Sequence, residues 1–243
     1  MKDALIIGAT SDVAKAIAFQ LAGSGTELTL MARDHQALDT LANDIQIRFG
    51  VAVNAVQIDL LDQASHKKAV DGLSSLPEVT FFLAGYLGDQ SNAENDWEEA
   101  SRILHSNFVG AVSILNLLAN KYEEEKSGVL AVFGSVAGDR GRQSNFLYGS
   151  AKAGLAAYLS GLRNRLSKSG VHVMTVKPGF MATKMTEDLE LPGILTAQPD
   201  EVAKSVIAAV RRRKNTIYVK WFWRYIMLII KLIPEGVFKK LKL

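Results

Sequence analysis

Three residues near the middle of the chain have the types and the spacing needed to move a proton. Tyr148 lies thirteen positions after Ser135, and Lys152 follows four positions later. Residues i and i+4 share one face of a helix, so the phenol and the ammonium would lie side by side. Because a nearby cation stabilises a phenolate, we predict that the pKa of Tyr148 lies below its ordinary value of about 10. Such a tyrosine is an acid usable near neutral pH.

A strand and a helix must position these residues. The apolar, β-branched run Val129–Phe133 predicts a buried strand, and Ser135 follows its carboxyl end, where open α/β sheets bind their ligands. Residues 144–169 predict the helix that carries Tyr148 and Lys152. Ser135 is therefore expected to face the same crevice as the phenol.

A second pair with the same spacing, Tyr122 and Lys126, has a different context. It lies in a charged run and has Val109, not a serine, thirteen positions upstream of the tyrosine. We interpret this pair as the solvated end of a helix.

The rest of the chain alternates between strand and helix patterns. Strands are predicted at 3–8, 27–32, 51–58, 78–84, 128–134, 170–176 and 215–219, and helices at 12–23, 35–49, 62–75, 95–125, 144–169 and 199–213. This alternation predicts one α/β domain with a doubly wound parallel sheet of about seven strands. We expect a catalytic domain over residues 1–219 and a basic, aromatic helical extension over 220–243.

Composition narrows the class of protein. A chain of 243 residues with 48% hydrophobic residues can bury one large core. It has no cysteine, which excludes disulfides, thiolate nucleophiles and thiolate metal sites, and no metal site is predicted. The first apolar run ends at Gly8 and is too short for a signal peptide, so we expect a cytoplasmic protein.

Taken together, these motifs resemble the short-chain dehydrogenase/reductase family. The resemblance covers about residues 3–215 and rests on the Ser135, Tyr148 and Lys152 set, the turn that begins at Gly8, and Pro178-Gly179 with Thr183. It implies a Rossmann-type fold and an oxidoreductase that uses NAD or NADP.

The resemblance also implies roles for individual residues. Tyr148 would donate the proton, Lys152 would lower its pKa and hold the nicotinamide ribose, and Ser135 would polarise the substrate carbonyl. Asn107 occupies the position of the family's helix asparagine, which connects the lysine to a chain of waters. The alternative is that Ser135 and Asn107 only cap or brace neighbouring segments.

The cofactor residues follow in the same way. In the first strand-to-helix turn, Gly8, Thr10, Ser11, Asp12 and Val13 would place a pyrophosphate on a helix amino terminus. Asp12 stands where the family has glycine, so its carboxylate must point away from the cofactor. Further contacts are expected from Asp59 and Leu60 near adenine, and from Ala84, Gly85, Tyr148, Lys152, Pro178, Gly179 and Thr183.

The choice of cofactor depends on the end of the second strand. An arginine there pairs with the extra phosphate of NADP, whereas an acidic residue accepts the ribose hydroxyls of NAD. Arg33 comes first and Asp34 follows. We therefore favour NADP, with a surface position for Arg33 as the alternative.

The carboxyl-terminal tail combines charge with hydrophobicity. Residues 211–243 contain ten Lys or Arg and one acid, a net +9, so the remainder carries −6 in a chain of net +3. The run from Trp221 to Ile233 is apolar except for two cations, and it is too short to span a bilayer. Either a helix in the interface of an anionic membrane or a lid or subunit contact fits this pattern. The acidic body and the lack of a binding motif argue against nucleic acid.

The loop before Tyr148 and the tail resemble one branch of the family in particular. Its reductases complete the epimerisation of decaprenylphosphoryl ribose to decaprenylphosphoryl arabinose, after a flavin-dependent oxidase has made the keto-sugar. This resemblance implies a polyprenyl-phosphate sugar as substrate, the oxidase as a partner, and a peripheral location on the inner face of the membrane. Arg140 and Arg142 would then meet the phosphate, with solvated loop arginines as the alternative.

Three hypotheses follow from these observations. The first is an NAD(P)H-dependent ketoreductase of a lipid-linked keto-sugar, acting as a homo-oligomer. The second is a reductase of acyl or other hydrophobic ketones that uses the tail as a lid. The third is a membrane-docked cofactor sensor without turnover, which has no need for the proton donor Tyr148.

Overall fold

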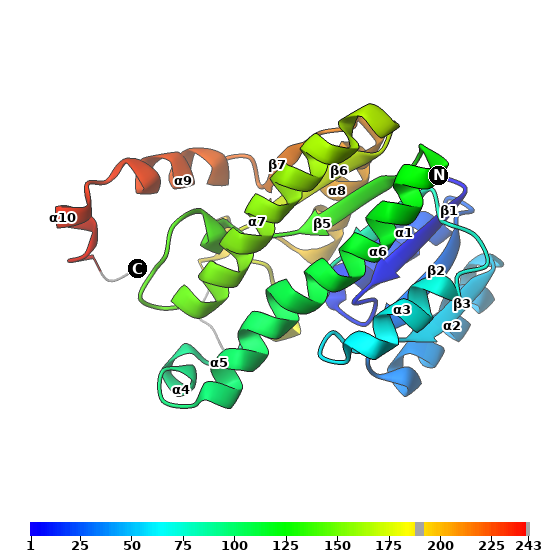
Figure 1. The fold of residues 1–243 in the computed structure, drawn as a ribbon, viewed down its shortest axis with the longest axis horizontal. Helices are drawn as coiled ribbons and strands as arrows, with labels where there is room; N and C mark the ends of the chain where they lie inside the picture. The colour runs from blue at the N-terminus through cyan, green and yellow to red at the C-terminus, as the bar shows by residue number, and fades with distance from the viewer. Residues whose placement is uncertain (188–191, 242–243) are drawn as a thin grey trace.

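Seven parallel strands form a single sheet in the order β3-β2-β1-β4-β5-β6-β7 (Figure 1). The computed structural model describes residues 1–187 and 192–241. The strands are β1 (Asp3–Ile7), β2 (Glu27–Ala32), β3 (Val53–Gln57), β4 (Val79–Phe82), β5 (Val129–Phe133), β6 (His172–Pro178) and β7 (Thr216–Val219). The doubly wound α/β fold predicted from the sequence is confirmed.

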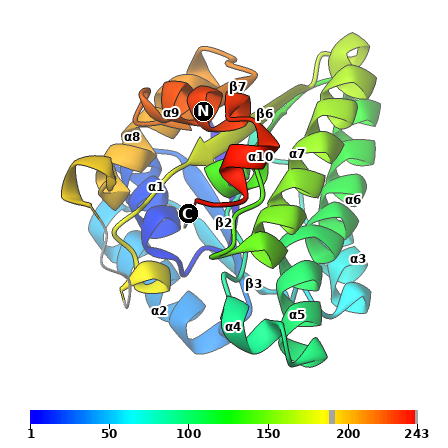
Figure 2. The ribbon, with the colours of Figure 1, turned by 90° about the vertical axis from the view of Figure 1, so that its left-hand side faces the viewer.

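Two layers of helices cover the faces of this sheet (Figure 2). The described helices are α1 (Asp12–Ala22), α2 (His35–Phe49), α3 (Gln63–Asp71), α4 (Gln90–Ala93), α5 (Trp97–Leu104), α6 (Gly110–Glu125), α7 (Phe146–Leu166), α8 (Pro199–Arg211), α9 (Trp223–Leu232) and α10 (Glu235–Phe238). Alternate side chains of each strand point to opposite faces. In β1, Ala4 and Ile6 therefore pack with α1, α2 and α8, whereas Leu5 and Ile7 pack with α3, α6 and α7.

The strand order reverses between β1 and β4, which pair with each other in the middle of the sheet. In open α/β sheets a crevice forms at such a point, outside the carboxyl ends of the strands. The turns after β1, β2, β4 and β5 all open there. This topology brings the candidate residues to one edge of the sheet.

The helix predicted over 95–125 contains an irregularity. It comprises α5, a π-helical turn η1 (His105–Val109) and α6. The stretch 97–125 is long and apolar enough to cross a membrane by composition, but half of its most apolar window is buried inside the protein. Because its apolar side chains cover the sheet, we interpret it as a core helix.

The Tyr122 and Lys126 pair differs from the prediction. Tyr122 is buried, and its hydroxyl donates to the Pro77 carbonyl oxygen at 2.7 Å and lies 2.9 Å from the Thr80 hydroxyl. Burial raises the pKa of this phenol. The tyrosine belongs to the inner face of α6, while Lys126 caps the helix with φ of 54°. The interpretation as a solvated helix end was wrong for the tyrosine.

The tail is divided by the last strand. The basic run at 211–214 precedes β7 and so lies at the amino-terminal edge of the sheet, whereas α9 follows β7 at the opposite edge (Figure 1). The single patch of +9 expected from the sequence is therefore two patches. Residues 220–243 hold six Lys or Arg and one Glu, a net +5.

Helix α9 has two apolar faces. Trp223 and Met227 are buried against Val136, with Ile226 and Ile230 partly buried beside them. The other face and the turn before it expose large apolar side chains, namely Trp221, Tyr225, Leu228, Ile229 and Leu232. One face thus holds the helix on the body and the other is open.

Candidate active site

The structure brings Ser135, Tyr148 and Lys152 together at the carboxyl end of β5. Ser135 begins the short 3-10 turn η2 (Val136–Asp139), and its hydroxyl accepts a hydrogen bond from the Ala137 N–H at 3.1 Å. Ser135 lies close enough to the Tyr148 hydroxyl to act on its pKa. The Lys152 ammonium donates to the carbonyl oxygen of Phe133 at 3.2 Å and lies 5.6 Å from the centroid of the Tyr148 ring.

The pKa of Tyr148 differs from the sequence prediction. Burial raises it to about 12, and Ser135 opposes this rise only in part. Burial also lowers the pKa of Lys152 to about 8. The prediction of a lowered phenol pKa was wrong for this structure, because the cost of desolvating a phenolate is the largest cause of the shift and Ser135 offsets only part of it. A raised pKa keeps the phenol protonated, which is the form that can donate a proton.

Asn107 lies within the π-helical turn η1 and is buried. Its amide nitrogen donates to the carbonyl oxygen of Ile103 at 2.8 Å and to that of Tyr86, and its Oδ1 accepts from the Tyr86 N–H at 3.2 Å. π-Helical turns occur often at functional sites. Here the turn fixes the Asn107 side chain toward the segment that follows β4.

Gly85 lies between Asn107 and Lys152. A Cβ atom at this position would lie 2.7 Å from Asn107 Oδ1 and 3.4 Å from Lys152 Nζ. The missing side chain therefore leaves space between the amide and the ammonium. A water chain between them, which the family resemblance implies, needs that space.

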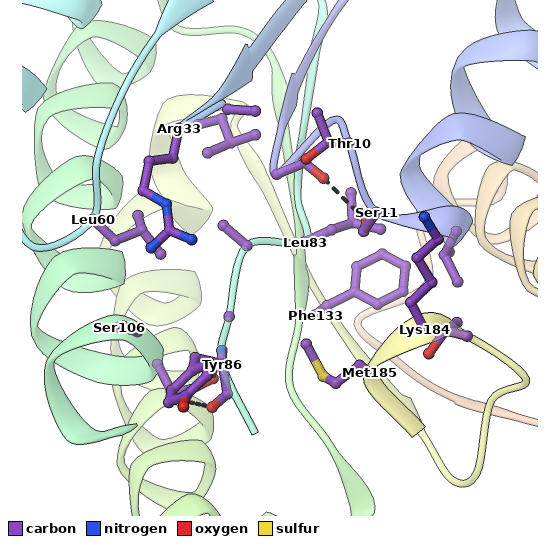
Figure 3. Close-up of a pocket in the computed structure, with 18 of the residues that line it drawn as sticks. Thr10, Ser11, Arg33, Leu60, Leu83, Tyr86, Ser106, Phe133, Lys184 and Met185 are labelled. Atoms are coloured by element: carbon purple, nitrogen blue, oxygen red, sulfur yellow. Dashed lines mark hydrogen bonds between the residues drawn. The ribbon is translucent and has the colours of Figure 1, made fainter. Parts of the chain in front are cut away.

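A cavity of about 370 Å³ opens beside this group (Figure 3). Most residues predicted to bind the cofactor line it, namely Gly8, Thr10, Ser11, Asp12, Val13, Arg33, Asp59, Leu60, Ala84, Gly85, Pro178 and Thr183, together with Asn107, Tyr148 and Lys152. Sequence reasoning missed others that line it, including Tyr86, Arg102, Ser106, Met181, Lys184 and Met185. Among these, Lys184 and Met185 directly follow the predicted Thr183, which was the available signal.

The turn after β1 has the shape that a phosphate-binding turn requires. Gly8 has φ of 86°, and a Cβ atom there would lie 2.6 Å from the backbone nitrogen of Ala84, so no other residue fits. Ser11 caps α1 by accepting from the Ala14 N–H at 3.4 Å. The Asp12 carboxylate accepts from the Lys184 backbone N–H at 2.8 Å, so it is turned toward that segment.

The end of β2 separates the roles of Arg33 and Asp34. The Asp34 carboxylate caps α2 by accepting from the Ala37 N–H at 3.0 Å. Arg33 lines the cavity, and its guanidinium extends across it (Figure 3). The acidic side chain is therefore occupied, and the arginine is the residue presented to a ligand.

Gly179 does not line the cavity, unlike its neighbour Pro178. A Cβ atom on Gly179 would lie 2.0 Å from the indole ring of Trp223. The indole packs edge-on against Phe180, with ring centroids 5.4 Å apart, and its Nε1 donates to the Leu195 carbonyl oxygen at 3.3 Å. The glycine thus admits the first turn of α9, and its role as a cofactor contact stays a prediction.

Arg140 and Arg142 are likewise absent from the cavity lining. The Arg140 guanidinium donates to the carbonyl oxygen of Ile233 at 2.7 Å and to Glu235 at 2.9 Å, and it stacks over the Phe238 ring at 3.6 Å. Arg142 is partly buried, and its NH2 donates to the carbonyl oxygen of Val136 at 3.3 Å. The contacts of both arginines are thus structural, because the tail and η2 supply acceptors that the sequence alone did not place nearby.

Comparison with known proteins agrees with this arrangement. Residues 2–192 match the family model described as short chain dehydrogenase. An uncharacterized oxidoreductase of Mycobacterium tuberculosis strain H37Rv is 35% identical over 240 residues, covering 98% of this chain and 96% of the relative. One of Streptomyces coelicolor is 33% identical, covering 98% and 94%.

Solved structures also share this fold. A short-chain dehydrogenase from Sphingobium yanoikuyae in complex with NADPH superposes with a TM-score of 0.83 at 24% identity, covering 99% of this chain and 96% of that one. With the family model and the relatives above, this likeness leads to one conclusion: the chain belongs to the short-chain dehydrogenase family of oxidoreductases.

Proposed function

We propose that this protein is an NADPH-dependent ketoreductase whose substrate is a lipid-linked keto-sugar. The observation that carries the reductase assignment is the grouping of Ser135, Tyr148 and Lys152 at the carboxyl end of β5, where Tyr148 and Lys152 line a cavity that Arg33 also lines. The protonated phenol, the buried ammonium and the strand-end hydroxyl are the groups that reduction of a carbonyl requires.

In this proposal each residue has one chemical task. The residues that line the cavity would hold a nicotinamide cofactor, which when bound would supply the hydride for the carbonyl carbon. Tyr148 transfers the proton of its hydroxyl to the carbonyl oxygen, so an alcohol forms. Ser135 donates a hydrogen bond to the same oxygen and holds the carbonyl in place, while the Lys152 ammonium stabilises the phenolate that remains. The space beside Gly85 and Asn107 gives water a route to return the proton.

Arg33 supports the choice of NADPH. A guanidinium pairs with a phosphate through two parallel hydrogen bonds, whereas it offers no acceptor to ribose hydroxyls. Asp34, the residue that would read those hydroxyls, already caps α2. The Sphingobium yanoikuyae enzyme of the same fold was solved with NADPH.

The tail supports a lipid-linked substrate. Helix α9 packs against η2, one turn beyond Ser135, and its outer face exposes Trp221 and Ile229 beside the cations Arg224 and Lys231. Aromatic and basic side chains around an apolar face suit the interface of an anionic membrane. We propose that this face docks there, at the inner surface of the cell membrane, and that a flavin-dependent oxidase supplies the ketone.

The same packing favours a second candidate function. Because α9 lies against η2 and Phe180, it also fits a lid over the pocket of a reductase of acyl or other hydrophobic ketones. A panel of keto-sugar phospholipids and acyl ketones, assayed with NADPH and NADH, separates the two candidates. Faster NADPH oxidation with an acyl ketone than with any keto-sugar lipid would exclude the first.

Tyr148→Phe tests the reductase assignment itself. The variant keeps the ring but loses the proton donor, so kcat should fall about 100-fold or more while the Kd for NADPH stays within about twofold. Phe146→Tyr changes the exposed first residue of α7, two positions before Tyr148, and serves as a control that should leave kcat unchanged. A Tyr148→Phe enzyme that keeps half of its kcat would rule out the assigned role.

A further inference from the structure

Lys184 adds a positive charge to the cavity, in addition to the charge of Arg33. It begins the 3-10 turn η4 (Lys184–Thr186), 172 positions after Asp12. Its side chain lines the cavity and extends toward the start of α1 (Figure 3). Within residues 1–187 and 192–241, no carboxylate lies within ion-pair distance of this ammonium.

Asp12 explains why the segment carrying Lys184 lies there. Its carboxylate accepts from the Lys184 N–H at 2.8 Å, which ties η4 to the first residue of α1. A second set of bonds orders the turn itself, because Thr186 Oγ1 donates to the Met181 carbonyl oxygen and accepts from the Thr183 N–H at 3.4 Å. Lys184 is thus presented by a braced turn.

The charges at the start of α1 determine how well this end of the helix can bind an anion. The amino terminus of a helix attracts an anion, but a carboxylate at that terminus opposes a second one. Asp12 therefore lowers the anion affinity of the turn after β1. The backbone of Lys184 is bonded to the same Asp12, and its side chain brings a positive charge back to the cavity where the diphosphate of a dinucleotide would lie.

We infer that Lys184 binds the cofactor diphosphate and that Asp12 is a positioning residue that holds Lys184 in place. The inference rests on the proposed cofactor site. An ammonium on a flexible stem serves this role because it acts as a point charge and can reach any of the diphosphate oxygens. In this chain Lys184, from the segment after β6, thus binds the diphosphate together with the turn after β1.

Cofactor fragments test the assignment. ADP-ribose contains the diphosphate but no 2′-phosphate, whereas 2′-AMP contains the 2′-phosphate but no diphosphate. Lys184→Met should weaken NADPH and ADP-ribose by about tenfold and leave 2′-AMP within about twofold. Arg33→Ala should weaken NADPH and 2′-AMP and leave ADP-ribose within about twofold. Dissociation constants for NADPH come from its fluorescence, and those for the fragments come from displacement of NADPH.

Two controls accompany this comparison. Lys184→Arg keeps the charge and should recover most of the affinity for ADP-ribose. Lys204→Met removes an exposed lysine on α8 outside the cavity lining and should change no constant, which isolates any general effect of net charge. An equal loss for all three ligands in Lys184→Met, or no loss for any of them, would overturn the diphosphate role.

A double-mutant cycle tests the positioning role of Asp12. In an Asp12→Ala background the ammonium is no longer held, so Lys184→Met should lose most of its effect on ADP-ribose affinity. Asp12→Asn keeps an acceptor for the Lys184 N–H and removes the negative charge, so it should bind ADP-ribose at least as tightly as the parent. Independent effects of the two mutations would overturn the positioning role.

Failure of the proposed function gives a different result. If the unmodified protein binds neither NADPH nor NADH nor either fragment, the cofactor assignment itself falls, and this inference falls with it. If NADPH binds and Arg33→Ala discriminates between the fragments, the cofactor assignment stands whatever Lys184→Met shows.

Discussion

Trp223 and Trp221 form a matched pair for separating the structural and the docking roles of the tail. Trp223 is 4% exposed and packs on Gly179 and Phe180, whereas Trp221 is 74% exposed. A tryptophan buries up to about 250 Å², so area alone gives about 6 kcal/mol as an upper limit for Trp223→Ala. Measured truncations of this kind cost about 3–5 kcal/mol. At about 2–4 °C per kcal/mol for this chain length, Tm should fall by roughly 6–20 °C.

Trp221→Ala should behave in the opposite way. Its stability should stay within about 0.5 kcal/mol of the parent, because an exposed side chain loses little packing. Its sedimentation with anionic vesicles should fall, and binding of the full-length parent should weaken with salt without vanishing. Thermal unfolding and vesicle sedimentation of both variants are the measurements. A parent that ignores vesicles, or a Trp221→Ala variant as unstable as Trp223→Ala, would refute the two-faced account of α9.

Four further predictions concern the active site and the anchor of the tail. Because burial lowers the pKa of Lys152 to about 8, affinity for NADPH should be constant up to about pH 8 and fall above it, and a flat profile to pH 10 would contradict this. Below that pH the folded state carries the cost of a buried charge, so Lys152→Met should raise Tm at pH 7 while it abolishes turnover. Gly85→Ala places a methyl group 2.7 Å from Asn107 Oδ1 and should lower kcat about tenfold or more, which steady-state kinetics would measure; an unchanged kcat would remove the role of the space. Arg140→Met should lower unfolding stability by about 1–3 kcal/mol with the KM of any anionic substrate unchanged, and a raised KM at constant Tm would restore its predicted phosphate role.

The sheet and the grouping of Ser135, Tyr148 and Lys152 could be predicted because their signals are local. Apolar runs such as Val129–Phe133 mark buried strands, and the spacing of Tyr148 and Lys152 needs only a helix to bring them together. Parallel topology then puts every strand end at one edge. The domain boundary expected at residue 219 is close to the start of α9, but the packing of Trp223 on Gly179 ties the two parts.

The parts that could not be predicted depend on contacts between distant segments. Nothing near Asp12 in the sequence indicates that its carboxylate meets Lys184, and nothing near Arg140 indicates the end of α9. The predicted direction of the Tyr148 pKa shift was wrong for a related reason. The sequence shows the neighbouring lysine but not the degree of burial, and burial sets the direction of the shift.

The placement of the three tryptophans means that fluorescence can follow the position of α9. Trp97 and Trp221 are 72% and 74% exposed, and Trp223 alone is buried, against Gly179 of the segment that leads to Thr183 and Lys184. Emission from Trp223 should therefore be blue-shifted and protected from acrylamide, while the other two are quenched. With Trp97→Phe and Trp221→Phe in place, a red shift on adding substrate or vesicles would reveal the release of α9 without any attached label. Because the Trp223 indole holds α9 to the body, the rate of its emission change can be compared with the rate of turnover.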